Sequence, residues 1–378
     1  MLSRIKSPSW IFLITLLPTL LIWLPFYLRL KNFWGIPLAQ GGMATIVANY
    51  DGPLYLVVAK TFYSVNLIKE SFQFPLSTEY YAAHFPLFPL IIKAFSYALG
   101  YPYAMLAITI TSSFLALYFF NKLLKEYVGE KDALFLTFVF SIFPARWLIV
   151  RSVGSADPLF LASIIASLYY FNQRKYLLAG IWGAIAQLTK SPGILLFISY
   201  LIMIVFPNIK DVAHAFFQKR VLPITLIPLS LFLVFLIYKF TYGDFLAYFK
   251  AGDNIHLFFP PFQIFNYALP WVGTFWQEEI VFIYLFGILG VLTLFKKRQY
   301  NLAIFTLVFW FTTLFISHRD LVRYSLPIVP FLFVAFSDFL VKREFKIAVV
   351  FLLLPIYLFS LAFISQNVMP ISNWAPFL

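Results

Sequence analysis

The sequence predicts an all-α protein: a polytopic bundle of transmembrane helices that forms a single domain over residues 1–378. Two bulk observations support this prediction. Hydrophobic residues make up 62% of the chain and charged residues only 11%, whereas a soluble domain is about 45–50% apolar and about 25% charged. A third observation is that long apolar runs recur along the chain with hardly any charge inside them. A soluble fold could not cover so much apolar surface, but a bilayer is itself apolar.

We expect eleven membrane spans, several of them shorter than the roughly 20 residues needed to cross about 30 Å of hydrocarbon. They are predicted at about residues 9–30, 101–122, 132–150, 157–172, 176–190, 192–207, 221–240, 279–295, 300–317, 325–341 and 346–365. The two short segments at 176–190 and 192–207 are expected to be half-buried helices that break at residues 191–193, Ser-Pro-Gly. The first apolar run has no small-residue cleavage site, so an uncleaved span is expected there.

Lys and Arg residues gather in the short connections on one side of this arrangement, which predicts that this side is cytoplasmic. These connections hold Arg4, Lys6, Lys122, Lys125, Lys131, Arg174, Lys175, Lys210, Lys219, Arg220, Lys296, Lys297, Arg298, Lys342, Arg343 and Lys346. The N-terminus is then expected in the cytoplasm, and the long stretches 31–100 and 241–278 on the outer face. The apolar run 85–99 is expected to lie at the membrane interface, because counting it as a span would move Lys122 and Lys125 outside.

Composition excludes several classes of partner and site. The net charge of +13 is spread through the connections, and no basic stripe is present, so no nucleic acid partner is expected. The chain has no cysteine, which excludes disulfides, thiolate metal sites and cysteine nucleophiles. Membrane lipids are the expected surroundings.

The most informative stretch is residues 49–55, Asn-Tyr-Asp-Gly-Pro-Leu-Tyr. Gly-Pro after Asp51 predicts a turn, and the residues that follow could form a short amphipathic helix at the membrane surface. A carboxylate at the edge of lipid is costly unless it is used or paired. Asp51 is therefore a candidate general base for a substrate hydroxyl, with partial desolvation raising its pKa. The structural alternative is an Asp that caps the following helix.

A second motif in the same stretch is residues 77–90, Ser-Thr-Glu-Tyr-Tyr-Ala-Ala-His-Phe-Pro-Leu-Phe-Pro-Leu. Glu79 and His84 are close enough in sequence to share a pocket with Asp51. His84 taken alone is more typical of a hydrogen-bonded residue at the membrane interface than of a catalyst or metal ligand. No metal site is assigned, although a divalent metal held by these three side chains remains open.

These two motifs resemble the first lumenal loop of the GT-C superfamily of membrane glycosyltransferases. The similarity is greatest to the PIG-V-like mannosyltransferases, which usually have Trp where this chain has Tyr50. The resemblance implies that Asp51 is the essential catalytic carboxylate. It also implies an inverting transfer of a sugar, with mannose expected, from a polyprenyl-phosphate donor to a lipid, glycan or protein acceptor. No cofactor is required by that chemistry. Tyr50, Tyr55, Glu79 and His84 are the predicted supporting or acceptor-binding residues.

Two weaker matches extend the likeness along the chain. Residues 177–197 resemble a GT-C hairpin with Lys190 at its basic position, and residues 323–327, Arg-Tyr-Ser-Leu-Pro, resemble an Arg-Tyr-x-x-Pro segment. Arg151, Lys190 and Arg323 are the predicted ligands of the donor phosphate, because arginine can hold phosphate oxygens in a fork. Arg146 and Arg319 are the next candidates for this role. The alternative for each is snorkelling toward lipid head groups.

Other outer residues have more general roles. Asp157 is expected to cap the helix that it begins, with pairing to Arg151 as the alternative. The stretch 241–278 is the candidate acceptor side, or equally an aromatic belt at the interface. It holds Asp244, Asp253, His256, Trp271, Trp276 and Glu278, and Glu279 follows.

Three other kinds of protein fit parts of the pattern. A transporter or flippase of lipid-linked saccharides would share the composition, but it predicts charge at mid-depth and related halves. An oligosaccharide polymerase or ligase would depend on Arg and His in later loops. A membrane scaffold would need none of the motifs. The expected function is therefore that of a glycosyltransferase.

Overall fold

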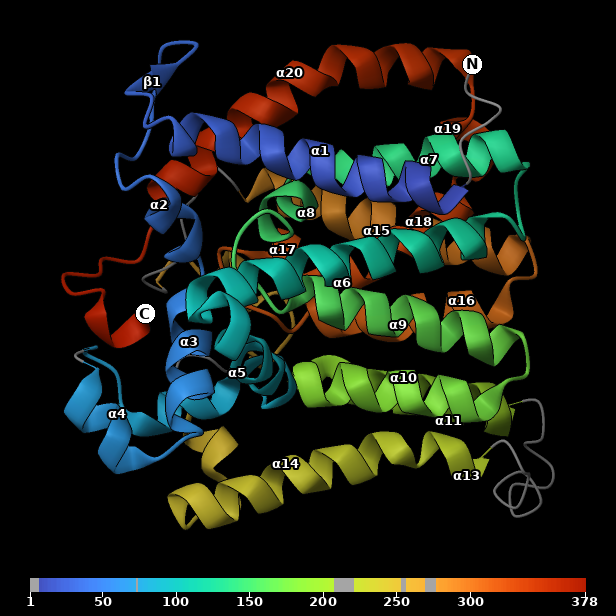
Figure 1. The fold of residues 1–378 in the computed structure, drawn as a ribbon. Helices are drawn as coiled ribbons and strands as arrows, with labels where there is room; N and C mark the ends of the chain where they lie inside the picture. The colour runs from blue at the N-terminus through green and yellow to red at the C-terminus, as the bar shows by residue number, and fades with distance from the viewer. Residues whose placement is uncertain (1–6, 73, 207–220, 253–255, 269–276) are drawn as a thin grey trace.

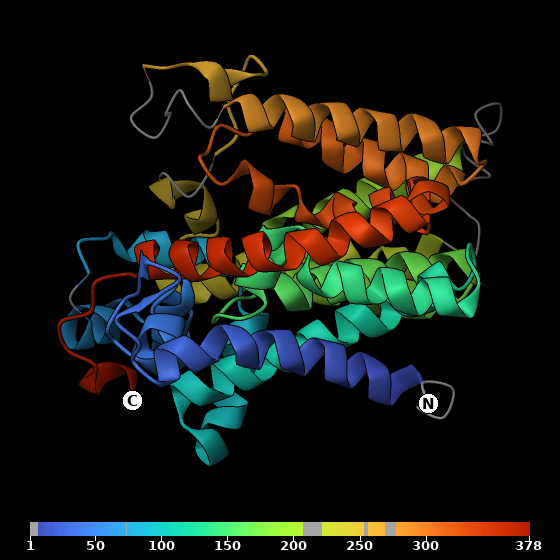
Figure 2. The same ribbon diagram turned by 90° about the horizontal axis from the view of Figure 1, so that it is seen from above.

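The computed structural model describes residues 7–72, 74–206, 221–252, 256–268 and 277–378. Helices dominate these residues, and the named strands among them form one short hairpin, β1 (Asn32–Phe33) with β2 (Ile36–Pro37). Long helices lie side by side in Figure 1 and again in the view from above in Figure 2. The predicted all-α bundle is confirmed.

Five stretches of helix among the described residues are long and apolar enough to cross a membrane. They are α1 (Ser7–Tyr27), α6 (Tyr101–Leu124), α13 (Val221–Ile224) with α14 (Leu226–Tyr242), α15 (Glu278–Lys296) and α20 (Arg343–Gln366). Their outward faces carry large apolar side chains, such as Phe351 of α20, which is 78% exposed. Lipid tails can cover such faces, whereas exposing them to water would cost free energy in proportion to their apolar area. The chain is an integral membrane protein.

Several of the other predicted spans correspond to shorter helices. They are α7 (Glu130–Ile142), α9 (Asp157–Asn172), α10 (Tyr176–Thr189), α11 (Ile194–Val205) and α16 (Tyr300–Thr313). With 12 to 16 residues each, they measure about 18–24 Å at 1.5 Å per residue. Almost all of α9 is buried, so this helix lies in the interior of the bundle. Its first residue, Asp157, is therefore enclosed by protein.

Two predicted spans are interrupted rather than continuous. In the span predicted at 132–150, α7 ends at Ile142 and α8 (Ala145–Val150) begins after Pro144, because proline lacks an N–H and does not fit a helix interior. The span predicted at 325–341 is divided among shorter helices. These are η8 (Leu326–Ile328), α18 (Val329–Ala335) and α19 (Ser337–Leu340), and α17 (Leu321–Tyr324) precedes them.

The predicted break between α10 and α11 is confirmed. Lys190 is extended, with φ −150° and ψ 145°, and η3 (Ser191–Gly193) follows it. A Cβ atom on Gly193 would lie 2.5 Å from the Cα atom of Gln187. Glycine therefore allows this turn to pack tightly against α10 while Lys190 leaves the helix.

The first long stretch forms a layer at one end of the bundle, at the left of Figure 1, where the C-terminus also lies. We call it the outer layer, because the sequence predicts that it lies on the outer face of the membrane. The layer contains α2 (Met43–Val47), α3 (Gly52–Thr61), α4 (Val65–Ser71), η2 (Thr78–Ala83) and α5 (Leu87–Leu99). The turns from α6 to α7 and from α9 to α10 lie at the opposite end. The interfacial position of α5 stays a prediction.

Helix α3 differs from its prediction. An amphipathic surface helix was expected after Asp51, but nine of the ten residues of α3 are buried. The tenth, Lys60, lies over the ring of Tyr101 at 4.7 Å. Helix α3 is therefore a core element, and it fixes the turn that carries Asp51.

The second long stretch is only partly described. Its short helices are η5 (Ala247–Lys250) and η7 (Gln263–Phe265), and η9 (Ala375–Phe377) follows near the C-terminus. The candidate acceptor-side residues Asp253, Trp271 and Trp276 lie outside the described residues. So do five of the basic residues used to predict sidedness: Arg4, Lys6, Lys210, Lys219 and Arg220.

Candidate active site

An alternating chain of charged side chains lies where the outer layer meets the bundle. Arg323 Nη2 donates to Asp51 Oδ2 at 2.8 Å, and Arg323 Nε donates to Asp157 Oδ2 at 2.9 Å. Lys190 Nζ donates to the other oxygen of Asp157, Oδ1, at 2.5 Å. Asp157 thus links two predicted site residues, Lys190 and Arg323, and Arg323 in turn links them to Asp51. Asp157 itself was predicted to cap a helix or to pair with Arg151.

A strained turn delivers Asp51 to this cluster. Tyr50 has φ 48°, in the left-handed region that costs a non-glycine residue about 1 kcal/mol or more. A Cβ atom on Gly52 would lie 2.4 Å from the carbonyl oxygen of Val47, so this close approach of backbone requires glycine. Asp51 occupies the N-cap position of α3 but makes no side-chain cap hydrogen bond. The Asp51 side chain therefore does not cap α3, which was its alternative role.

Asp157 is the hub of the cluster. It is the first residue of α9, and Ala156 occupies the N-cap position, with no side-chain cap hydrogen bond. The Asp157 carboxylate instead accepts from the hydroxyl of Ser155 at 2.9 Å and pairs with Lys190 and Arg323. Both expectations, a helix cap and a pair with Arg151, are corrected. Breaking such a buried pair on one side costs about 3–5 kcal/mol, so Asp157 holds both cations firmly.

A second ion pair adjoins the first cluster. Arg146 Nε lies 3.1 Å from Asp320 Oδ1, and Arg146 Nη1 donates to the Tyr50 hydroxyl at 3.0 Å. The Arg323 guanidinium lies over the ring of Tyr50 at 4.6 Å, a favourable cation–π geometry. Tyr50 therefore joins the two pairs, which is a positioning role for one of the predicted supporting residues.

Asp51 is the accessible member of the cluster. Its side chain is 34% exposed, against 10% for Asp157 and 10% for Arg323. Burial raises the pKa of Asp51, but the adjacent Arg323 guanidinium and its hydrogen bond more than offset this, so the pKa lies below its ordinary value. The expected rise of this pKa by desolvation is corrected, because the neighbouring cation outweighs desolvation.

His84 and Tyr55 lie beside the carboxylate. Their rings meet edge to face with centroids 4.9 Å apart, and both side chains are almost fully buried. Burial lowers the pKa of His84 even though the charge of Asp51 opposes this, so the imidazole is neutral near pH 7. Among the residues that the structure describes, its Nδ1 has no hydrogen-bond partner, which leaves a neutral donor or acceptor available close to Asp51.

Glu79 does not join this group. Its carboxylate accepts from the hydroxyl of Thr78 at 3.4 Å, and its charge acts on Tyr242 and Lys250. The structure thus brings Asp51 and His84 together but leaves Glu79 elsewhere in the layer. Within the described ranges, no three His, Asp or Glu side chains are grouped to hold a metal ion.

Arg151 has a structural setting. Its side chain is fully buried, and it donates to the carbonyl oxygens of Ser141 at 2.7 Å and Thr15 at 2.9 Å and to the hydroxyl of Thr19 at 3.1 Å. Its guanidinium therefore joins α1 to the α7–α8 region, and this geometry does not support the prediction that it binds phosphate. Arg319, by contrast, is exposed next to the site.

The second outer stretch reaches the site through an aromatic cluster. The rings of His256 and His318 have centroids 4.2 Å apart, and Tyr324 meets both rings, at 5.8 Å and 5.4 Å respectively. Burial, with His256 next in effect, lowers the pKa of His318 to about 3. Of the other candidates there, Asp244 pairs with Lys250, and Glu278 and Glu279 begin α15. Among the described residues of this stretch, His256 therefore lies against His318 and Tyr324, which adjoin Asp51 and Arg323.

Sequence reasoning missed Asp320, His318 and Tyr324 as site residues. The one available signal was local: His318 and Asp320 flank Arg319, a few residues before Arg323. The role of Asp157 had no local signal, because its cations lie 33 and 166 residues away in sequence.

The fold itself is similar to that of a known membrane enzyme. The described helices match the crystal structure of ArnT from Cupriavidus metallidurans bound to undecaprenyl phosphate, with a TM-score of 0.56. The match covers 96% of this chain and 75% of that chain at 12% sequence identity. ArnT has the helical GT-C fold.

This chain has the GT-C fold. The predicted GT-C-like helical fold is thus confirmed along nearly the whole chain. No family model matches the sequence, and neither does any curated protein. The PIG-V-like subtype stays a prediction.

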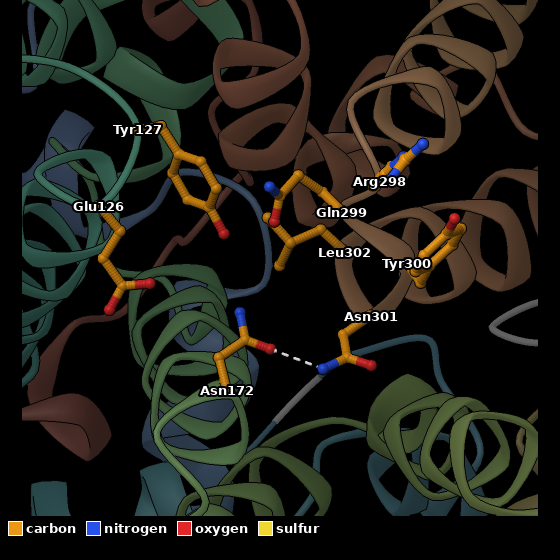
Figure 3. Close-up of a pocket in the computed structure, with 8 residues that line it drawn as sticks. All are labelled: Glu126, Tyr127, Asn172, Arg298, Gln299, Tyr300, Asn301 and Leu302. Carbon is orange, nitrogen blue, oxygen red and sulfur yellow. Dashed lines mark hydrogen bonds between the residues drawn. The ribbon is translucent and has the colours of Figure 1, made fainter. Parts of the chain in front are cut away.

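A separate recess lies at the opposite end of the GT-C bundle (Figure 3). Its volume is about 390 Å³, and Asn301 Nδ2 donates to Asn172 Oδ1 at 2.9 Å in its wall. The other lining residues are Glu126, Tyr127, Arg298, Gln299, Tyr300 and Leu302. It adjoins the turns at the ends of α6, α9 and α15, so it is distinct from the Asp51 cluster.

Proposed function

We propose that this chain is an inverting glycosyltransferase that uses a polyprenyl-phosphate-linked sugar on the outer or lumenal face of the membrane. The observation that carries the proposal is an accessible carboxylate, Asp51, bonded to Arg323 in the outer layer of a GT-C fold. The similarity to ArnT bound to undecaprenyl phosphate supports a polyprenyl-phosphate donor. Mannose is the proposed sugar, on the strength of the PIG-V-like motifs. The acceptor is a lipid, glycan or protein hydroxyl.

In the proposed reaction, the acceptor oxygen attacks the anomeric carbon from the face opposite the phosphate. The bond between that carbon and the phosphate oxygen breaks, and polyprenyl phosphate leaves with the electron pair. Asp51 takes the proton of the acceptor hydroxyl, and a positioned base of this kind contributes about 10²–10⁴-fold to rate. No cofactor is needed for these steps.

Arg323 explains how a carboxylate with a lowered pKa can serve as that base. Arg323 is anchored to Asp157 through Nε while Nη2 holds Asp51. A donor phosphate offers the guanidinium a charge-assisted, two-pronged partner. We propose that the phosphate takes over the Nη side of Arg323 and releases Asp51. Once the cation no longer faces it, desolvation raises the pKa of Asp51 and makes it a stronger base.

The surrounding residues divide into two sides. Lys190 and Arg323, both tied to Asp157, support the donor phosphate, with the exposed Arg319 as a further cation on that side. His84 and Tyr55 support the acceptor hydroxyl near Asp51. The rings of the His256, His318 and Tyr324 cluster offer flat faces against which sugar C–H groups can pack. Tyr50 keeps Arg146 and Arg323 in place.

The alternative function, transport of lipid-linked saccharides, has less support. The charged cluster gathers near one end of the bundle, where the outer layer lies. A transporter built around these residues would also move its substrate without consuming it. The decisive difference is therefore the formation of a new glycosidic bond.

The test is sugar transfer by purified protein in liposomes that contain labelled polyprenyl-phosphate mannose and extracted lipid acceptors. Asp51→Asn is expected to lower kcat by about 10²–10⁴-fold while the protein stays folded. Asp244→Asn is the matched control, because its carboxylate is similarly exposed, at 32%, and also pairs with one cation. Equal transfer by wild type and Asp51→Asn would refute the role of Asp51. Wild-type transport without product would favour the alternative.

The pH dependence tests the exchange at Arg323. Since kcat/KM reports ionisation in the free enzyme and kcat reports it in the complex, the two should differ. The lowered pKa of free Asp51 predicts that the acid limb of kcat/KM lies below the ordinary aspartate value, near 3.8. The acid limb of kcat should lie at higher pH, because bound phosphate removes Arg323 from the carboxylate. Coincident acid limbs would contradict the exchange.

A further inference from the structure

The C-terminal segment, residues 367–378, contacts the turn that carries Asp51. Val368 forms an antiparallel bridge with Asn49, and the Met369 N–H donates to the carbonyl oxygen of Ala48 at 2.7 Å. This main-chain link joins residues more than 300 positions apart, immediately before Tyr50 and Asp51.

Asn49 is the centre of this contact. Its side chain has an exposed fraction of 0%. Its Nδ2 donates to the carbonyl oxygens of Ile364 at 2.8 Å and Thr45 at 3.3 Å, and its Oδ1 accepts from Asn367 Nδ2 at 3.2 Å. The Asn49 amide is therefore hydrogen-bonded to α2, to the end of α20 and to the segment beyond α20. Removing it would leave buried partners unpaired.

The far end of the segment is anchored separately. The ring of Phe377 is 4% exposed and meets Phe72 and Phe74 edge to face, with centroids 5.1 Å and 5.9 Å apart. The segment is thus attached at both ends of its course, first to the Asn49 turn and then to the residues after α4.

We propose that residues 367–378 form a strap over the outer layer and that Asn49 is a positioning residue that sets where the Asp51 carboxylate lies relative to Arg323. The left-handed conformation of Tyr50 and the close approach at Gly52 make the turn dependent on such external restraint. The catalytic consequence rests on the proposed glycosyltransferase function. A misplacement of about 1 Å can cost about 100-fold in rate, so a strap at this position acts directly on transfer.

The first experiment does not depend on activity. Amide hydrogen exchange of residues 48–55 is measured in wild type, in Asn49→Ala and in the protein shortened by residues 367–378. Faster exchange in both altered proteins is expected, because each loses hydrogen bonds that hold the turn. Ser372→Ala, an exposed position of the same segment, is the control and should match wild type. Unchanged exchange in both altered proteins would overturn the strap.

The second experiment measures transfer by the same proteins. Asn49→Ala is expected to lower kcat by up to about 100-fold with an unchanged donor KM, because the phosphate-binding cations are left in place. A synthetic peptide of residues 367–378 should restore transfer to the shortened protein. Faster exchange with full kcat would overturn the positioning role of Asn49. If wild type transfers no sugar, the proposed function fails, and hydrogen exchange still decides whether the strap exists.

Discussion

Two arginines of this protein, Arg323 and Arg151, have different kinds of hydrogen-bond partner. Arg323 joins two carboxylates near the solvent-accessible edge of Asp51, a position from which it can meet an incoming phosphate. Arg151 is enclosed, and carbonyl and hydroxyl oxygens of α1 and of Ser141 satisfy it. Both lie near the outer ends of predicted spans, so residue type and depth alone could not separate them. What separates them is the set of partners that the fold provides.

Separate substitutions of the buried Arg151 and the exposed Arg319 should distinguish a structural role from a role in binding the donor. Arg151→Met is expected to lower the free energy of unfolding by about 2–4 kcal/mol, because several buried acceptors lose their donor. The folded fraction should keep the wild-type donor KM. Arg319→Gln, on an exposed side chain, should change stability by no more than about 0.5 kcal/mol and raise the donor KM several-fold. Thermal unfolding in detergent and transfer kinetics measure these effects. A raised donor KM in folded Arg151→Met would contradict this assignment.

At the scale of elements, the short and broken helices are what create the site. Helix α9 begins inside the bundle with Asp157, and α10 ends inside it just before Lys190. The breaks after Ile142 and around Tyr324 let backbone leave the helical path close to Arg146 and Arg323. Irregular backbone at membrane depth is tolerated where protein surrounds it. Full-length spans would instead have carried these side chains to the rim of the bundle.

Two glycines test how tightly the Asp51 element is packed. Alanine at Gly52 would place a Cβ atom 2.4 Å from a backbone oxygen of Val47, whereas alanine at Gly154 would meet the flexible end of Met105. Gly52→Ala is therefore expected to cost about 1–3 kcal/mol of stability and to reduce transfer by at least about tenfold, since the turn must move. Gly154→Ala should be milder, because a methionine can adopt another rotamer. Thermal unfolding and transfer assays compare the two variants. Equal losses of stability and transfer in the two variants would show that the turn can shift to accommodate the added methyl group.

At the scale of the whole molecule, the outer layer and the C-terminus lie at one end of the bundle in Figure 1, and the basic turns from α6 to α7 and from α9 to α10 lie at the other. The charged cluster adjoins the outer layer through Asp51. This arrangement agrees with the separation of long and short connections in the sequence. The direction in which the bundle sits in the membrane is a prediction from the positive charge of the short turns.

The absence of cysteine from the sequence makes this orientation straightforward to test. Lys69→Cys lies in α4 of the outer layer, and Lys175→Cys lies in the turn between α9 and α10; both positions are exposed. A membrane-impermeant maleimide is expected to label Lys69→Cys in intact cells and Lys175→Cys only after the membrane is opened. The reverse pattern would place the N-terminus outside and the Asp51 cluster in the cytoplasm.

The sequence by itself determined the class of the protein and part of its site. Its apolar composition required a membrane bundle, and proline and glycine predicted the break at residues 191–193, because both effects are local or additive along the chain. The first-loop motif also identified Asp51 as a member of a candidate site, and the two weaker GT-C matches added Lys190 and Arg323. Only the tertiary structure decided that α3 is buried, that Asp157 joins Lys190 to Arg323, that Arg151 is buried among oxygens of α1 and Ser141, and that Asn49 meets the C-terminal segment. Each of these depends on partners distant in sequence, and the pairing of buried polar groups is settled by which helices pack together.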